Sequence, residues 1–304
     1  MRNLLFGLLC IAAGLSYFAC SEKFSATGKD ASITPANTFA VVLKDAKIDN
    51  AIEATNYETD MISTAEASIS AYDQGALKSG HIMDYAFFKA LFEHFPAFKF
   101  HYFKGITPNI SIVTTNGGFP KTMVLDYGES TVLDNGTVLK GKITMVLSGA
   151  PKSWGTTISV TYANYSVDSI GISGTTVKTK TKDTAPTFSE KSDLTVTLAD
   201  GTNLHRVAEK TRIWIAGFDT EFNPADDIIN ITGSVTVSDS KGDSYSRTIT
   251  KPLVKKGTCK FITQGIIEFK NSNGKFATID YGNGECDNLA TLTNQQGTKQ
   301  IIIK

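Results

Sequence analysis

Apolar and polar residues alternate with a period of two along most of the chain after Gly105. The clearest run is Ile229–Ser238, in which isoleucine, glycine and valine hold one parity while asparagine, threonine and serine hold the other. Such alternation is typical of a β-strand with one buried and one solvated face. Similar runs are Ile143–Leu147, Thr157–Tyr162, Asp193–Leu198, Thr211–Ala216 and Ile266–Phe269.

Short turn sequences separate these runs, and no helical pattern lies between them. The turns are Asn135-Gly136, Lys241-Gly242-Asp243, Asn271–Gly274 and Asn294–Gly297. Strands joined by short turns pair antiparallel, whereas parallel strands need long crossover connections. We therefore predict a mainly β fold of antiparallel sheets, either sandwich-like or an extended meander.

The segment 39–104 has a different pattern. From Phe39 to about Ala71 the residues favour a helix, because proline and glycine are missing and Val41, Ile48 and Ile52 recur at helical spacing. The apolar face of this helix is narrow and interrupted. The helix therefore forms either a spacer or a layer packed on the β body.

Seven phenylalanines follow within residues 85–103. Such density suits a core, or else an exposed platform that stacks on sugars or inserts into a membrane. Phe98, Phe100 and Tyr102 alternate with Lys99 and His101, as they would along a strand. This alternation favours core packing.

The first nineteen residues predict an export signal. Arg2 is followed by an apolar run from Leu4 to Leu15, which is too short for the about 20 residues of a membrane-spanning helix. Phe18-Ala19-Cys20 closes this segment and resembles the lipobox, in which the cysteine is acylated and becomes the first residue of the mature chain. Tyr17 departs from the branched aliphatic residue usual there, and an ordinary signal peptide is the alternative.

The residues after Cys20 predict a tether. Ser21-Glu22-Lys23 resembles the short acidic surface-export signal of Bacteroidetes-type lipoproteins. Residues 20–38 contain little that could be buried, so we expect a flexible segment that holds the body away from the bilayer. Two acyl chains on Cys20 would bind the outer membrane stably.

Two of the four cysteines remain after the signal peptide is removed and Cys20 is acylated. Cys259 lies 12 residues before Asn271, and Cys286 lies 12 residues after Gly274. A hairpin that folds symmetrically at this turn places the two cysteines opposite each other. We therefore predict a disulfide between Cys259 and Cys286 that staples two strands in an oxidising compartment.

Two segments 154 residues apart look alike. Each enters a turn with Asn-Gly, and each returning strand ends in Asp-Tyr-Gly, at Asp126–Gly128 and at Asp280–Gly282. This duplication predicts two related β units, over residues 105–200 and 201–304. The first unit has no cysteine where the second has Cys286.

At this point the chain resembles a family of Bacteroidetes-type outer-membrane surface lipoproteins. The resemblance covers most of the chain after Gly105 and implies an envelope location and a β fold, but no activity. The matching segments are Phe119–Thr122, Leu125–Gly128, Lys140–Ile143, Thr250–Val254, Ile279–Asn288 and the apolar C-terminal strand that ends at Lys304.

Candidate sites for chemistry are few. Oxygen donors gather between Asp280 and Asn288, but their spacing does not match a calcium-binding EF-hand, and tight turns select the same residue types. Asp226-Asp227 has the composition of a solvated loop. The histidines 81, 94, 101 and 205 form no metal-binding spacing, and no nucleophile elbow or phosphate loop is present. We expect no metal, no cofactor and no catalytic residues, although a catalytic pair of carboxylates distant in sequence would leave no local motif.

Two tryptophans are candidates for ligand binding. Trp154 and Trp214 would line a glycan-binding face if their rings were exposed, and sheet packing is the alternative for both. Asp168-Ser169-Ile170 and Asp183-Thr184-Ala185 resemble O-glycosylation acceptor sites of the same phylum. The mature chain has 29 cations against 30 anions, without a basic stripe, which argues against nucleic acid as a partner.

Two functions are compatible with these features. The leading hypothesis is a non-enzymatic surface lipoprotein with a structural, adhesion or host-interaction role. The alternative is a glycan-binding lipoprotein of a polysaccharide uptake system.

Overall fold

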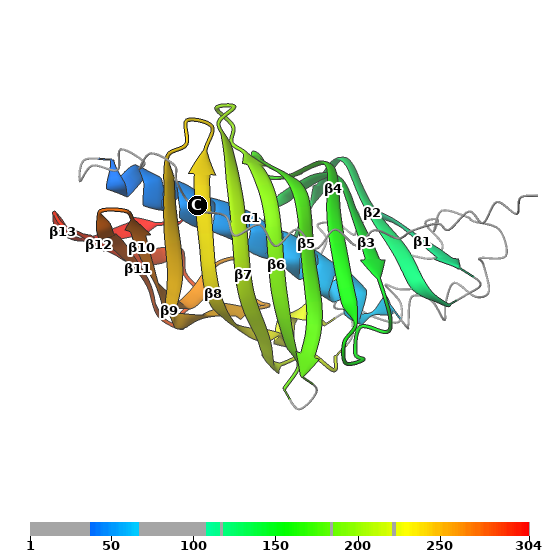
Figure 1. The fold of residues 1–304 in the computed structure, drawn as a ribbon. Coiled ribbons are helices and arrows are strands. Elements are labelled where there is room, and N and C mark those ends of the chain that lie inside the picture. The colour runs from blue at the N-terminus through cyan, green and yellow to red at the C-terminus, as the bar shows by residue number, and fades with distance from the viewer. Residues whose placement is uncertain (1–36, 67–107, 116–117, 183–184, 221–222, 304) are drawn as a thin grey trace, which may run out of the picture.

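The computed structural model describes residues 37–66, 108–115, 118–182, 185–220 and 223–303. In this part of the chain one long helix precedes thirteen strands, so the fold is mainly β as predicted (Figure 1). Cys20, most of the tether and the aromatic segment 85–103 lie outside the described residues. The elements are α1 (Thr38–Thr64), β1 (Asn109–Thr115), β2 (Gly118–Val132), β3 (Val138–Leu147), β4 (Thr157–Val167), β5 (Ile170–Lys182), β6 (Thr187–Thr197), β7 (Asn203–Ala216), β8 (Ile228–Asp239), β9 (Ser244–Lys256), β10 (Ile262–Asn271), β11 (Gly274–Asn283), β12 (Leu289–Asn294) and β13 (Gly297–Ile302), with a 3₁₀ turn at Pro224–Asp226.

All thirteen strands belong to one antiparallel sheet, in which each strand pairs with its neighbours in sequence. Of the two predicted arrangements, the extended meander is therefore the one present. The boundary between the two predicted β units falls in the turn between β6 and β7, and these strands pair without interruption from Thr187↔Ile213 to Thr197↔Asn203. Both units thus share one continuous sheet.

The predicted strand segments lie in β3, β4, β6, β7, β8 and β10, and only Asp193–Leu198 runs one residue past its strand. Hydrophobic alternation did not indicate β5, β9, β12 or the first half of β7. In β5, β9 and the first half of β7 the inward positions include the buried residues Lys178, Arg206, Lys210 and Arg247. Charge on the buried face therefore interrupts the alternation in these three places.

Helix α1 packs on the sheet and is not a spacer. It crosses β5–β9 obliquely, and the ends of the sheet curl toward it (Figure 1). Near its start, Val42 and Ala46 join an apolar cluster with residues of the C-terminal strands. Further along, Ile48 and Ile62 join a second cluster with residues of β1–β5. A twisted open sheet of more than about ten strands tends to curl, and here α1 fills the concave side.

Helix α1 ends at Thr64, and residues 67–71 of the predicted helix lie outside the described residues. The hydroxyl groups of Ser63 and Thr64 donate to the backbone carbonyl of Asp60, at 3.2 and 2.9 Å. Serine and threonine that bond back to the preceding turn weaken helix continuation.

Buried charges join α1 to the middle of the sheet. On the helix, Asp45, Asp49 and Glu53 repeat every four residues and therefore lie on one side. Each carboxylate meets a cation that projects from an inward strand position. The five buried carboxylates and five buried cations of this interface are Asp45, Asp49, Glu53, Asp60 and Glu190, and Lys178, Arg206, Lys210, Arg212 and Arg247.

Asp49 lies at the centre of these contacts. Its Oδ1 accepts a hydrogen bond from Arg206 Nη2 at 2.7 Å, and its Oδ2 accepts one from Arg247 Nη1 at 2.8 Å. Glu53 accepts from Arg212 Nη1 at 2.6 Å and from Lys210 Nζ at 3.0 Å. Two carboxylates of one helix thus hold four cations from two strands.

Burial raises and neighbouring cations lower the pKa values of the helix carboxylates, and the larger effect differs from one position to the next. Burial opposes ionisation of Glu53, but the charges of Arg212 and Lys210 outweigh it and hold the pKa of Glu53 at about 2. The pKa of Asp49 is likewise lowered by Arg247, Lys210 and Arg206 against the effect of burial. At Asp45 the effect of burial is larger than that of the Arg247 charge, so the pKa of Asp45 is raised. Asp49 and Glu53, at the centre of the interface, are therefore held in their ionised form more strongly than Asp45.

Replacement of Asp49 by asparagine tests this interface. D49N removes the buried carboxylate paired with Arg206 and leaves Arg247 with Asp45 as its remaining partner, so we expect the free energy of unfolding to fall by about 3–5 kcal/mol. Urea denaturation measures the change. The matched control is E209Q, which breaks the exposed Lys191–Glu209 pair and should cost less than about 1 kcal/mol. Equal small losses in both variants would contradict a structural role for the buried charges.

Candidate functional site

A cavity of about 260 Å³ opens along one side of α1. The helix contributes Lys47, Asn50, Ala54 and Tyr57, which follow each other at a spacing of three or four and form its least buried stripe. Two other walls come from the end of β9 with the loop that follows it, and from the turns β2–β3 and β4–β5. The cavity therefore lies where segments far apart in sequence approach the helix.

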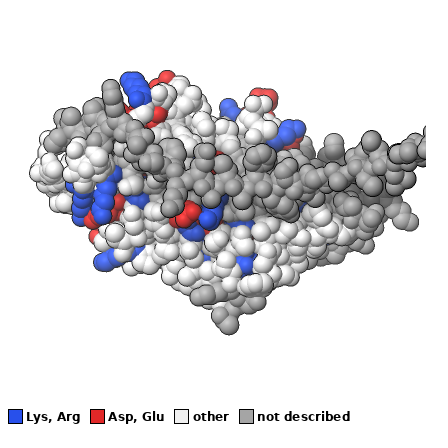
Figure 2. Space-filling model, in the orientation of Figure 1, with Lys and Arg blue, Asp and Glu red and all other residues white. Residues whose placement is uncertain are grey.

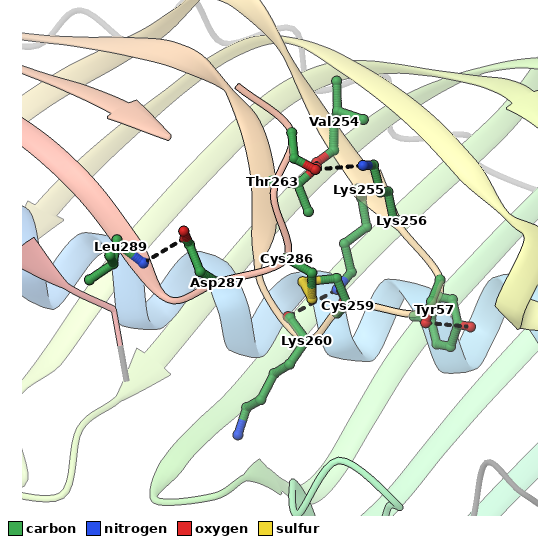
Figure 3. Close-up of a disulfide and its surroundings, with 12 residues drawn as sticks. Tyr57, Val254, Lys255, Lys256, Cys259, Lys260, Thr263, Cys286, Asp287 and Leu289 are labelled. Carbon is green, nitrogen blue, oxygen red and sulfur yellow. Dashed lines mark hydrogen bonds between the residues drawn. A yellow bond between two sulfur atoms is a disulfide. The ribbon is translucent and has the colours of Figure 1, made fainter. Parts of the chain in front are cut away.

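A disulfide between Cys259 and Cys286 stands at the β9–β10 wall (Figure 3). It is the pairing that the symmetry of the Asn271–Gly274 turn predicted. β10 and β11 pair from Asn271↔Gly274 to Gln264↔Asn283, and the two cysteines follow just beyond that last pair. Cys259 is buried and lines the cavity, whereas Cys286 lies on the exposed side. The disulfide ties the loop of the cavity to the loop that follows β11.

Lys255 is the buried cation of this wall, with 7% of its surface exposed. Its ammonium group donates to the backbone carbonyl of Cys259 and, at 2.9 Å, to that of Lys260 (Figure 3). Burial lowers the pKa of Lys255 to about 8; Glu53 opposes this shift, and Arg212 and Lys260 add to it. The amine is thus held among carbonyl groups at the edge of the cavity.

The opposite wall is the turn between β4 and β5. Asp168 has φ +52° there, a conformation that aspartate tolerates better than most residues. Its Oδ1 accepts from the backbone N–H of Val138 at 2.9 Å, and its own N–H donates to the carbonyl of Val138 at 2.7 Å. Lys260 Nζ lies 3.9 Å from Asp168 Oδ2, so the two walls face each other across a partly exposed ion pair.

The two tryptophans occupy different environments. Trp154 is 71% exposed in the β3–β4 turn, and its indole N–H donates to the carbonyl of Thr181 at 3.2 Å. Trp214 is 5% exposed and packs against Phe188 and Phe218, with ring centroids 5.3 and 5.7 Å away. The proposed glycan-binding use of Trp214 is therefore wrong, because its ring is covered in the core.

The Asp-Tyr-Gly motifs form the same local structure twice. Asp126 Oδ1 accepts from the N–H of Gly128 at 3.0 Å, and Asp280 Oδ1 accepts from that of Gly282 at 2.9 Å. Both glycines have positive φ, and each motif lies at a register shift inside its strand, β2 or β11. The strands therefore run past Asp-Tyr-Gly, and the prediction that they end there is wrong. Asp287 bonds to its own turn in the same way. The oxygens between Asp280 and Asn288 thus include two carboxylates that accept hydrogen bonds from nearby backbone N–H groups.

The other residues that the sequence singled out as candidate sites lie in separate parts of the fold where the structure describes them. His205, the described member of the four histidines, lies on the outer face 2.7 Å from Asp193. Asp226 accepts hydrogen bonds from Thr220 and Asn223 within the β7–β8 loop. Ser169 lines the cavity at the β4–β5 turn, whereas Thr184 lies outside the described residues. These groups share no common site.

The cavity could not be found from the sequence, since its walls come from four separate segments without a shared motif. In the described ranges, no group of three His, Cys, Asp or Glu side chains is arranged to hold a metal ion. Helix α1 is not apolar enough to span a membrane. Comparisons with protein-family models, curated proteins and solved structures give no match, so function is inferred from the geometry above and the sequence signals.

Removal of the disulfide tests its contribution to the fold. The double variant C259S/C286S opens a loop with a sequence separation of 27 residues, and we expect a loss of about 3–4 kcal/mol in the free energy of unfolding. Urea denaturation with and without a thiol reductant measures it. Reductant should destabilise the wild type to the level of the variant and leave the variant unchanged. An oxidised wild type no more stable than the variant would contradict the prediction.

Proposed function

We propose that the protein is a non-enzymatic lipoprotein of the outer membrane, displayed at the cell surface through lipid on Cys20, with a structural, adhesion or host-interaction role. The observation that carries this proposal is the position of α1. It is the first element after the tether, and it is held inside the sheet by buried ion pairs. The lipid anchor thereby connects to the centre of the body.

This arrangement suits a protein that bears load or presents a surface. A pull on Cys20 passes through the tether to α1, and α1 contacts strands at both ends of the sheet through its two apolar clusters. Displacement of the helix would separate several buried cations from their carboxylates at the same time, which is strongly unfavourable. The body should therefore stay folded when the anchor is under tension.

The charge distribution supports a non-enzymatic role. Buried acidic and basic side chains form ion pairs with each other between α1 and the sheet, and these pairs position the helix. Elsewhere, Figure 2 shows Lys and Arg side chains mixed with Asp and Glu side chains in small groups over the described part of one face. A face with mixed charge suits solubility and contact with varied partners.

Substitution of Cys20 tests the anchor and the display. In a Bacteroidetes host, the wild type should incorporate labelled palmitate, fractionate with the outer membrane and react with a membrane-impermeant amine reagent on intact cells. C20A should lose both the label and the membrane association, because the acylated thiol is missing. The control C10A should behave as wild type. An unlabelled wild type, or a labelled one shielded from the reagent on intact cells, would refute lipidation or surface display respectively.

A second candidate function is glycan binding, and the exposure of Trp154 favours it. The indole is held by its bond to Thr181 while most of its surface remains open. A fixed, exposed aromatic ring can stack on the apolar face of a sugar. A single such ring predicts weak binding.

Affinity electrophoresis in gels containing common polysaccharides tests this candidate. If glycan binding is correct, the wild type is retarded on at least one polysaccharide, W154A loses the retardation and W154F keeps most of it, because phenylalanine preserves the ring face. Trp214 offers no such test, since its replacement would open a core cavity. Equal mobility of wild type and W154A on every polysaccharide would eliminate a role for this face.

A further inference from the structure

The lining of the cavity beside the disulfide combines cationic and apolar residues. Lys47 of α1 lines it, as do Lys255 and Lys260 of the β9 wall and its loop. Apolar residues line it as well, among them Ala54, Leu133 and Ile170. A site with a few polar groups set against an apolar surface is the usual design of a small-molecule pocket.

The charges around the cavity favour an anion. The lining includes three lysines and one carboxylate, that of Asp168, so it carries a net charge of about +2. Asp168 is also engaged by the backbone of Val138 and holds the turn in place. A monoanion in the cavity would be attracted by the excess of cations and would meet one repulsive group.

Lys255 offers a specific contact. An ammonium group has three N–H donors, and the described residues supply acceptors for two of them, the carbonyls of Cys259 and Lys260. A carboxylate can accept the third. Because Lys255 is buried and fixed by the loop, such a bond would form with little loss of side-chain freedom.

The volume limits the size of the ligand. About 260 Å³ is slightly below the range of drug-sized pockets. The cavity therefore suits a ligand smaller than a typical drug molecule.

We propose that this cavity binds a small amphipathic monocarboxylate, with its carboxylate toward Lys255 and its apolar body against α1 and the β4–β5 turn. This site is independent of the anchor and of Trp154. It assigns to the protein a ligand class that neither the structural nor the glycan-binding role requires.

Binding of octanoate, measured by isothermal titration calorimetry, is the experiment. The protein is the mature chain, residues 20–304 with C20A, which avoids lipid and detergent. We expect one saturable site with a Kd below about 1 mM. Octan-1-ol has the same chain without charge, and glucuronate has the charge without the apolar chain; both should bind at least tenfold more weakly. Binding of octan-1-ol equal to that of octanoate would refute the anionic site, and equal binding of glucuronate would refute the apolar wall.

Variants locate the site. A54F places a ring in the cavity and should abolish binding, whereas A40F, the same change at an exposed position of α1 outside the cavity, should leave the Kd unchanged. K255M should weaken binding at least tenfold. D168N keeps the Oδ1 acceptor for Val138 but removes the one anion, so octanoate should bind about threefold more tightly or better.

Thermal unfolding shows whether each variant is folded. A loss of binding in K255M supports the site if the variant is folded and if A54F and D168N also bind as expected. Unchanged binding in A54F, or weaker binding in folded D168N, would overturn the proposed site.

Discussion

The pairing of buried charges between α1 and the middle strands is the constraint on which the rest of the fold depends. Apolar and acidic residues are distributed around most of this helix, so its orientation is not set by a single hydrophobic face. The carboxylates at positions 45, 49, 53 and 60 can meet their cations at one rotation and one axial position only. Buried ion pairs add little net stability, but a wrong register would leave charges unpaired, so they specify the arrangement.

The placement of α1 organises both ends of the sheet. Its N-terminal part packs with the C-terminal strands and its C-terminal part with the first strands. The duplicated Asp-Tyr-Gly motif fits this geometry. Tyr127 is buried and donates to Glu58 of α1 at 2.9 Å, and Tyr281 is buried near the opposite end of the sheet. Each motif combines a register shift within a strand with an inward tyrosine beneath the helix.

The cavity follows from the same architecture. A helix enclosed by a curled sheet keeps one less buried stripe, and the turns of distant hairpins converge on it. The disulfide fixes one wall, and the paired backbone of Asp168 and Val138 fixes the other. A binding site framed by such fixed loops on a rigid sheet needs little reorganisation to accept a ligand.

The sequence by itself determined a mainly β, antiparallel fold, since period-two patterns joined by short turns exclude parallel crossovers. That the strands form one extended meander instead of a sandwich was decided by the tertiary structure. The sequence also determined the Cys259–Cys286 pairing, because both cysteines are equally distant from one turn. It did not reveal β5 or β9, whose inward lysines and arginines break the hydrophobic alternation, although the four-residue spacing of Asp45, Asp49 and Glu53 was a visible sign of a charged helix face. The burial of Trp214 and the cavity were decided by tertiary structure alone. Whether a charged position faces the core depends on a counter-charge from a distant segment, and no local pattern records that partner.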